Sequence, residues 1–387
     1  MGVNVYQETA EDGISLAELE LYHLITDYRS SKGLSAIPLS KALTATAGRH
    51  ALDTVHNLEG YPVGAPGESK GHSWSDAPYD GRNPETYDNM WFAPKRLGTG
   101  YDGYGYEIST GYPRTPGYSI PDMTPSTAFK GWLGSEPHRK VIANEDPWLP
   151  PWHAWKAIGI GLYEEVSHVW FGADPDPTGA PLILGSSQSD GVTLTGFDDR
   201  FIGFAGDDTI DGGAGLDIVL LQDLRRNCTV HHGDGVILVH GADGARTLMN
   251  VERVGFDDGT LVLDPGDAAF SVYRLYEAAL DRAPDGPGLT AWTYANTTGM
   301  SMTEMARQFM AAPEFVQRFG NPDNAGFVDL LYRNVLDRPA DEAGASGWLG
   351  ALASGEMTRE HVLLQFADSV ENIAKVNATV GDGIWLA

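Results

Sequence analysis

The chain contains a single cysteine, Cys228, so it cannot form an internal disulfide bond. This excludes the small secreted scaffolds whose stability depends on several disulfide bonds. Because an isolated cysteine usually behaves as a small apolar residue, Cys228 is expected to lie in a core rather than to act as a nucleophile.

Basic residues are also scarce. The chain has 26 lysines and arginines against 53 aspartates and glutamates, which gives a formal net charge of −27. Nucleic acids and anionic membranes attract proteins through a positive surface, so neither is an expected partner. The excess of acidic residues instead suits a protein that binds cations.

Long apolar runs are missing as well. No segment reaches the roughly 18–20 apolar residues of a transmembrane helix. Residues 1–15 lack the basic start and the apolar run of a secretory signal peptide. The chain is therefore expected either to stay in the cytoplasm or to leave the cell by a route that does not read the N-terminus. Its 387 residues predict two or three domains.

A nine-residue period runs through residues 184–220. An aspartate recurs at every ninth position, and an apolar residue follows each aspartate two positions later. A short fixed period indicates stacked repeats that each form one short strand. Glycines permit turns with positive φ, and aspartates supply the hard oxygen ligands that calcium prefers. The aspartates are Asp190, Asp199, Asp208 and Asp217, the apolar residues are Val192, Phe201, Ile210 and Val219, and the turn glycines are Gly206, Gly213 and Gly215.

These periods resemble the calcium-binding nonapeptide repeats of secreted bacterial RTX proteins. The resemblance implies a short parallel β-roll that holds calcium through the four aspartates and the glycine turns, with the aspartates crowded along one edge. It also implies export by the type I secretion machinery on an uncleaved C-terminal signal. Residues 251–260 resemble the segment that closes many such rolls, and a cap is needed because an open strand edge promotes aggregation. An ordinary turn region rich in glycine and aspartate is the alternative.

Helix and strand patterns alternate in residues 1–172. A capping box at Ser15 and Glu18 predicts a helix, and a second helix is expected over residues 40–58. Residues 157–162 and 168–172 have the pattern of a hairpin of two strands. The intervening segment 61–125 is expected to be a long loop, whose aromatic residues either line a groove or pack among themselves. They are Tyr79, Tyr87, Trp91, Tyr101, Tyr104, Tyr106, Tyr112 and Tyr118.

Several short motifs follow one another in the same region. They are Asp27-Tyr28-Arg29, Gly71-His72-Ser73, Gly105-Tyr106-Glu107-Ile108, Trp132-Leu133-Gly134-Ser135-Glu136-Pro137-His138-Arg139, Ile158-Gly159-Ile160-Gly161 and Trp170-Phe171-Gly172. In this order they resemble the cysteine-poor bacterial branch of the CAP superfamily. The resemblance implies an α-β-α sandwich with a cleft that contains two histidines, one or two acids and sometimes a divalent metal ion.

By position in these motifs, His72 and His138 match the two cleft histidines, and Glu107 matches the cleft glutamate. Ile108 stands where asparagine is usual, and Ser135 stands where many eukaryotic members have a second acid. The resemblance therefore predicts either a zinc-like site at His72 and His138 or a buried polar network, with Glu107 as the candidate base of any catalysis. The other histidines, including His50 and His168, match no ligand of the family.

The last part of the chain repeats on a longer period. Residues 275–292 return as residues 331–348, and the helical pattern of both copies resembles a domain of unknown function found beside RTX repeats. The Asp-Arg-x-x-Asp turn of each copy either binds calcium or forms an Arg–Asp ion pair. Trp292 and Trp348 occupy equivalent positions and are expected to anchor the core.

The sequence therefore predicts a multidomain protein. A CAP-like α-β-α sandwich is expected at residues 1–172, a linker at 173–181, a short parallel calcium β-roll with a β cap at 182–266, and an all-α tandem repeat with a secretion signal at 267–387. The expected function is calcium-dependent extracellular binding of an unknown ligand. The alternative is a metal-assisted hydrolase of peptide or glycan that uses the cleft. Calcium is the expected cofactor, with zinc or another divalent ion in the cleft.

Overall fold

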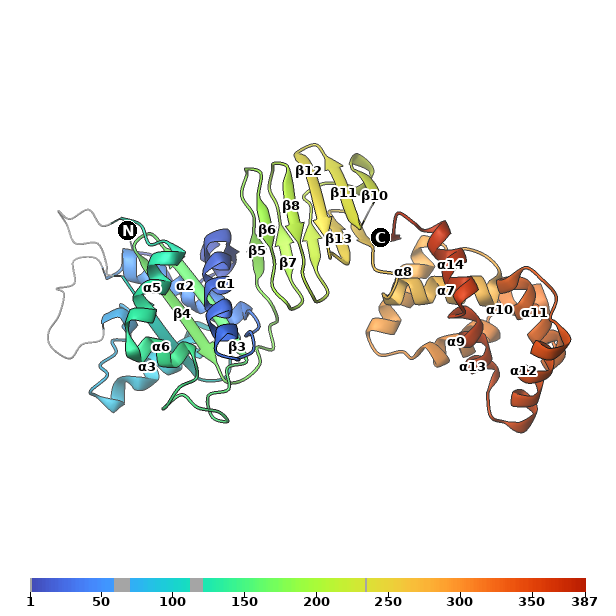
Figure 1. Ribbon diagram of the computed structural model, residues 1–387, viewed down its shortest axis with the longest axis horizontal. Helices are drawn as coiled ribbons and strands as arrows, with labels where there is room; N and C mark the ends of the chain where they lie inside the picture. Colours follow the sequence, from blue (N-terminus) through green and yellow to red (C-terminus); the bar gives the residue numbers. More distant parts are fainter. Residues whose placement is uncertain (1, 59–69, 112–120, 234) are drawn as a thin grey trace. The chain divides into compact units, whose positions relative to one another are not determined.

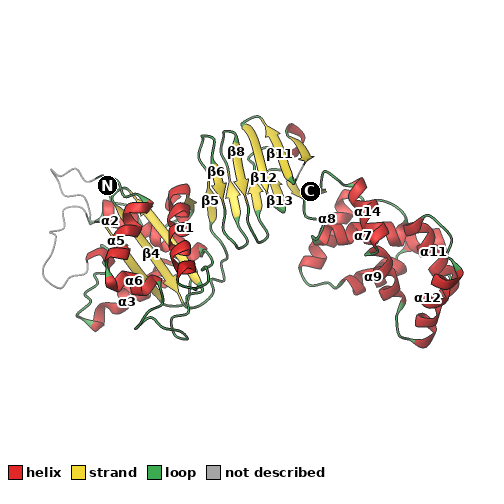
Figure 2. Cartoon of the chain, in the orientation of Figure 1, coloured by secondary structure: helices red, strands yellow, loops and turns green. Residues whose placement is uncertain are grey.

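The computed structural model describes residues 2–58, 70–111, 121–233 and 235–387. The chain is multidomain, with its sheets mainly in the N-terminal part and helices in the C-terminal part (Figure 2). Contacts divide it into two compact units, residues 1–220 with 243–250 and residues 221–242 with 251–387. No helix within the described ranges is long and apolar enough to cross a membrane.

A three-stranded antiparallel sheet lies at the centre of the N-terminal part, in the order β2-β4-β3 (Figure 1). Strands β3 (Ala157–Tyr163) and β4 (Val166–Gly172) form the predicted hairpin. Strand β2 (Gly105–Thr110) pairs with β4.

The prediction of one long loop over residues 61–125 is wrong in its described part. Besides β2, it contains helices α3 (Tyr87–Trp91) and α4 (Ala93–Leu97). These elements are too short to give a periodic signal in the sequence. Tyr112 and Tyr118 lie outside the described residues.

The two predicted helix starts are confirmed, because Ser15 and Glu18 form the capping box of the first helix and Ser40 caps the second. Thr124 caps a third helix, which starts with a proline. These helices are α1 (Leu16–Ser31), α2 (Lys41–His56) and α5 (Pro125–Gly134), which is followed by α6 (Glu136–Ile142).

Helix α2 packs directly on strand β3 at two glycines. A Cβ atom on Gly159 would lie 2.0 Å from the carbonyl carbon of Leu43, and one on Gly161 would lie 2.3 Å from that of Ala47. Residues that alternate along β3 point to opposite faces, so Ile160 points to the face that α1 and α5 cover. The Ile-Gly-Ile-Gly motif thus brings the backbone of α2 against the sheet.

Replacing Gly159 by alanine is expected to destabilise the protein by about 1–3 kcal/mol, because the added methyl group meets backbone atoms that cannot move alone. Gly134→Ala is the matched control, since nothing lies within 4 Å of the position of its added Cβ. Urea unfolding of both variants measures the difference. Equal unfolding midpoints for the two variants would contradict the close packing of α2 on β3.

The nine-residue repeats form short parallel strands in two sheets (Figure 1). Successive strands alternate between the sheets, so each of the first three strands pairs with the strand eighteen residues further along the chain. The predicted apolar residues Val192, Phe201, Ile210 and Val219 are buried. The strands are β5 (Leu182–Leu184), β6 (Gly191–Thr193), β7 (Arg200–Ile202), β8 (Asp208–Asp211) and β9 (Ile218–Leu220).

Two strands that the sequence did not predict extend these sheets. Strand β1 (Ile14–Ser15) pairs in parallel with β5, so the residues just before α1 cover the edge of the sheet that contains β5, β7 and β9. Strand β12 (Gly244–Met249) pairs in parallel with β8.

The second unit begins with antiparallel strands. Cys228 is buried there, as predicted. Residues 229–241 form one antiparallel pair of strands and residues 253–262 form another, to which a C-terminal strand adds. The strands are β10 (Thr229–Gly233), β11 (Val236–Gly241), β13 (Arg253–Phe256), β14 (Gly259–Val262) and β15 (Ile384–Leu386).

The helical region contains two copies of a four-helix unit. Equivalent aspartates, Asp281 and Asp337, end the first helix of each copy with positive φ angles of 51° and 50°. The first copy is α7 (Ala268–Leu280), α8 (Gly286–Thr297), α9 (Met302–Ala311) and α10 (Pro313–Phe319); the second is α11 (Asn324–Leu336), α12 (Glu342–Ser354), α13 (Arg359–Ala367) and α14 (Val370–Thr379).

The acidic turn of each copy is held by an ion pair. Arg338 lies 2.9 Å from Asp341, whereas Arg282 lies 3.9 Å from Asp285 and pairs more closely with Glu314, at 2.5 Å. The same two aspartates accept hydrogen bonds from the first turn of the next helix, at Gly288 and Gly344. These contacts favour the ion-pair interpretation in the second copy, and calcium binding by the turns stays an untested alternative.

The two repeat tryptophans lie at the edge of the helical core rather than inside it. Trp292 and Trp348 are partly buried, with ring centroids 5.1 Å from Phe309 and 5.4 Å from Phe366. Replacing either tryptophan by alanine is therefore expected to cost about 2–3 kcal/mol, less than the loss of a fully buried aromatic residue. Phe309→Ala, at a residue only 3% exposed, should cost more. Urea unfolding of the three variants tests this order of stability. A tryptophan variant that unfolds at a lower urea concentration than Phe309→Ala would contradict it.

Candidate metal centres

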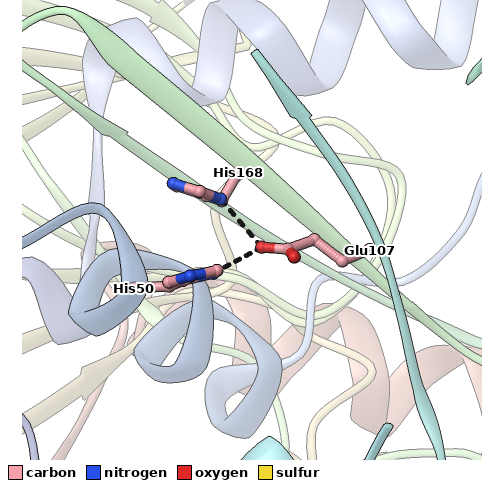
Figure 3. Close-up of side chains that lie close together, drawn as sticks. All are labelled: His50, Glu107 and His168. Carbon is pink, nitrogen blue, oxygen red and sulfur yellow. Dashed lines mark hydrogen bonds and ion pairs between the residues drawn. The ribbon is translucent and has the colours of Figure 1, made fainter. Parts of the chain in front are cut away.

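Glu107 is surrounded by histidines that come from separate elements. Glu107 lies on β2 opposite Trp170 of β4, and His168 lies two residues before Trp170, so the two polar side chains share one face of the sheet. His50 comes from α2, which packs on that face. Its Nδ1 lies 2.6 Å from Oε1 of Glu107, and Nδ1 of His168 lies 2.8 Å from the same oxygen (Figure 3).

A third imidazole contacts the other oxygen of this carboxylate. Nδ1 of His72, at the end of the 3₁₀ helix Lys70–His72, lies 2.8 Å from Oε2 of Glu107. The side chains of Glu107 and His50 are fully buried, that of His168 is 1% exposed, and that of His72 is 19% exposed. His72 is therefore the member of this cluster that faces solvent.

The far nitrogens of the two buried imidazoles also have partners. Nε2 of His50 lies 3.1 Å from the carbonyl oxygen of Ser73, and Nε2 of His168 lies 3.2 Å from the hydroxyl of Thr54. The ring of Trp74 stacks on His50 at 4.1 Å, with 11° between the planes. These contacts fix the orientation of the two imidazoles.

The pKa values of the cluster move in opposite directions. Burial alone would raise the pKa of Glu107, but His50 and His168 hold it well below its usual value. Burial opposes the charge on His50, yet Glu107 raises the pKa of this histidine. Burial and the neighbouring His50 lower the pKa of His168 to about 4. Because a carbonyl oxygen and an ionised carboxylate can only accept, His50 donates from both nitrogens and forms an ion pair with Glu107.

The structure brings two of the three residues predicted from the sequence into contact, His72 and Glu107. His138 lies on α6, where burial and a charge on the nearby His72 lower its pKa. In the described parts of the chain, however, the one group of three ligand atoms within 4.8 Å of one another is that of His50, Glu107 and His168. Metal binding at His72 and His138 stays a prediction.

The sequence contained a signal for both missed histidines. His50 follows Ala47 by three positions, so it lies on the helix face that packs against the sheet. His168 alternates with Trp170 on a strand, which places both side chains on one face. Recognising them as partners of Glu107 also required the pairing of β2 with β4, which are far apart in sequence.

The aspartates of the repeats lie in two columns, not along one edge as predicted. Oδ1 of Asp208 accepts a hydrogen bond from the backbone of Asp190 at 3.1 Å, and Oδ1 of Asp217 accepts one from that of Asp199 at 2.8 Å. Each contact spans eighteen residues because successive strands alternate between the sheets. The four aspartates therefore form two pairs, each joined by a hydrogen bond from the backbone of one to the carboxylate of the other.

The turn glycines are required by backbone conformation and by close stacking. Gly206, Gly213 and Gly215 have φ angles of +105°, +90° and +134°. A Cβ on Gly206 would lie 2.5 Å from the carbonyl carbon of Gln188, and one on Gly215 equally close to that of Phe197. Each turn therefore stacks directly on the turn that precedes it by eighteen residues, and no side chain fits between the two backbones.

The surroundings of the aspartates suit a cation. Burial raises the pKa of Asp199 and of Asp208, because the neighbouring hydrogen-bond donors and charges only partly compensate for the loss of water around the ionised carboxylates. Oδ2 of Asp208 is buried without a hydrogen bond, and the nearest positive group, Arg246, lies 3.6 Å away. Calcium accepts several oxygen ligands at 2.3–2.6 Å, so the acidic turns offer suitable donors.

Comparisons with known proteins cover only parts of the chain. Residues 260–319 and 306–376 match the family model described as "Domain of unknown function (DUF4214)", which confirms the predicted resemblance of the helical region to a domain of unknown function. No curated protein matches the chain.

A solved structure also matches a short part of the chain. The extracellular lipase LipA from Serratia marcescens is 19% identical over 20% of this chain, with a TM-score of 0.12. The match spans 14% of the lipase chain.

Proposed function

We propose that this chain is a secreted, calcium-dependent binding protein of the extracellular space, exported by type I secretion. In this proposal a CAP-like domain carries the ligand site, the stacked repeats form a calcium β-roll, and a helical tandem repeat follows. The observation that carries it is the eighteen-residue stacking of acidic glycine turns, with Asp190 below Asp208 and Asp199 below Asp217.

Calcium dependence follows from the charge of the stack. The negative charge of Asp190 disfavours ionisation of Asp208, and residues 182–220 bury only one apolar side chain in each short strand. Extracellular calcium modules bind at about 10⁻⁴–10⁻³ M, so the stack would remain loose in a cytosol poor in free calcium. It would order after export.

Calcium titration of the chelated full-length chain tests this proposal. Calorimetry should detect sites with dissociation constants of about 10⁻⁴–10⁻³ M, and excess magnesium should compete poorly because it demands a more rigid octahedral geometry. The absence of any calcium binding up to about 10 mM, well above that range, would refute the proposal.

The binding surface of the proposed ligand site consists of aromatic rings beside His72. The chain of ring contacts starts between His72 and Tyr79 at 5.7 Å and continues to Tyr87, Trp91, Tyr106 and Trp148. All these rings are partly exposed. Aromatic side chains with one accessible face contribute much of the contact energy in recognition sites, so this array favours a binding role.

The surroundings of Glu107 count against the alternative of a hydrolase. A general base works best with a pKa near the working pH and needs access to the water that it activates. Glu107 is fully buried, its pKa is held well below the usual value, and its oxygens already accept from His50, His168 and His72. Its contacts suit positioning of the imidazoles better than catalysis.

A further inference from the structure

We propose that His50, His168 and Glu107 form a buried site for Zn²⁺ or a similar borderline divalent ion. The site lies beside the cleft of the proposed function. Only this description of its location rests on the proposed function. It uses different ligands from the pair His72 and His138, and it does not depend on calcium in the repeats.

The first argument is the convergence of the ligand atoms. Both imidazoles direct Nδ1 at one oxygen of Glu107, at 2.6 and 2.8 Å, and the three ligand atoms lie within 4.8 Å of one another (Figure 3). Zinc bonds to nitrogen and to carboxylate oxygen are about 2.0–2.2 Å long, which sets neighbouring ligand atoms of a tetrahedral ion about 3.3 Å apart. Outward shifts of less than about 1 Å would admit the ion in place of the two Nδ1 protons.

The second argument is the state of the far nitrogens. Histidines that bind a metal ion usually donate their other N–H to a carbonyl or a similar acceptor, which fixes the tautomer. Nε2 of His50 faces the carbonyl of Ser73, and Nε2 of His168 faces the hydroxyl of Thr54. Both Nδ1 atoms are thus the nitrogens left for an ion.

The third argument concerns burial and access. The three proposed ligands have side chains that are 0–1% exposed, so the site excludes bulk water. His72 covers the second oxygen of Glu107 with a side chain 19% exposed, which makes it the accessible edge through which an ion would enter. Its hydrogen bond also orients the carboxylate, a role that metal sites commonly give to a neighbouring side chain.

A metal-free network is the competing explanation. One carboxylate faces three imidazoles, and the ion pair of His50 with Glu107 stabilises the cluster without any metal. The two explanations predict different results. A metal site binds one ion for each chain and loses it when a ligand is replaced, whereas the polar network alone binds none.

The test uses the chelated full-length chain in excess calcium, titrated with Co²⁺ as a visible probe for zinc sites. We expect one equivalent of cobalt with ligand-field absorption. His50→Gln and His168→Gln should each weaken uptake at least about 100-fold, and His72→Gln by about 10–100-fold, as for the loss of an orienting partner. His138→Gln is the matched control and should change affinity less than about threefold, because its side chain lies outside the group of three.

Three results would overturn the proposal. Unmodified protein that takes up no cobalt would leave only the polar network. Uptake that survives His50→Gln and His168→Gln but is lost in His138→Gln would assign the ion to the pair predicted from the sequence. Near-ultraviolet circular dichroism shows whether His50→Gln and His168→Gln fold. If they do not, zinc X-ray absorption of the zinc-loaded His138→Gln variant is the deciding measurement. The proposal requires two imidazole ligands to the ion in that variant, and fewer than two would contradict it. Calcium titration of the same samples shows separately whether the proposed function holds.

Discussion

Replacing Glu107 by alanine is expected to destabilise the N-terminal domain by about 3–5 kcal/mol, the typical cost of removing one partner of a buried charge pair. The substitution removes the carboxylate that keeps the buried His50 charged, so this imidazole must give up its proton, and it leaves the Nδ1 groups of all three histidines without their acceptor. Urea unfolding in chelator, with Trp74 in the cluster as part of the fluorescence signal, measures the loss free of any contribution from bound metal.

Two further variants serve as comparisons for Glu107→Ala. Glu107→Gln keeps the shape and one acceptor oxygen, so its loss should be smaller than that of Glu107→Ala. Glu136→Ala removes an exposed glutamate whose ion pair with Lys140 lies on the surface, and it should change stability little. If Glu107→Ala unfolds at the same urea concentration as Glu136→Ala, the buried cluster does not stabilise the domain.

The double substitution Asp208→Ala/Asp217→Ala is expected to abolish the effect of calcium on stability. It removes one carboxylate from each column, together with the hydrogen bonds to the backbone of Asp190 and Asp199. Calcium at 100 times its dissociation constant stabilises a folded protein by about 2.7 kcal/mol for each site, so the loss should be at least of this size. Thermal unfolding with calcium and with chelator measures it.

The control for this variant is Asp27→Ala/Asp122→Ala, which changes the net charge equally at two exposed positions of the α/β domain. It should retain the full rise in unfolding temperature with calcium. An unchanged response to calcium in Asp208→Ala/Asp217→Ala would place the calcium sites elsewhere.

Local signals in the sequence predicted individual helices and strands better than they predicted how these elements are arranged in space. The capping box at Ser15 and the nine-residue period were read correctly because cap geometry and burial repeat within a few residues. The two columns of aspartates were missed because the period gives the spacing of strands but not the sheet to which each belongs. Strands β1 and β12 were missed because they pair with distant segments rather than with neighbours in sequence.

The candidate site shows the same limit. The motifs identified Glu107 and His72, which do meet. His50 and His168 carry no motif, and their convergence depends on the packing of α2 against Gly159 and on the pairing of β2 with β4. Such a constellation follows from tertiary structure, so only the structure could select these histidines from the eleven in the chain.

Calcium-dependent order in the stacked repeats is the central claim, and hydrogen exchange of the full-length chain, read by mass spectrometry, tests it most directly. With calcium, amides of residues 182–220 should be protected, because their parallel strands are hydrogen-bonded across two sheets. In chelator the same peptides should exchange much faster, whereas helices α7 and α11 should not change. Identical exchange of residues 182–220 in calcium and in chelator would contradict the account.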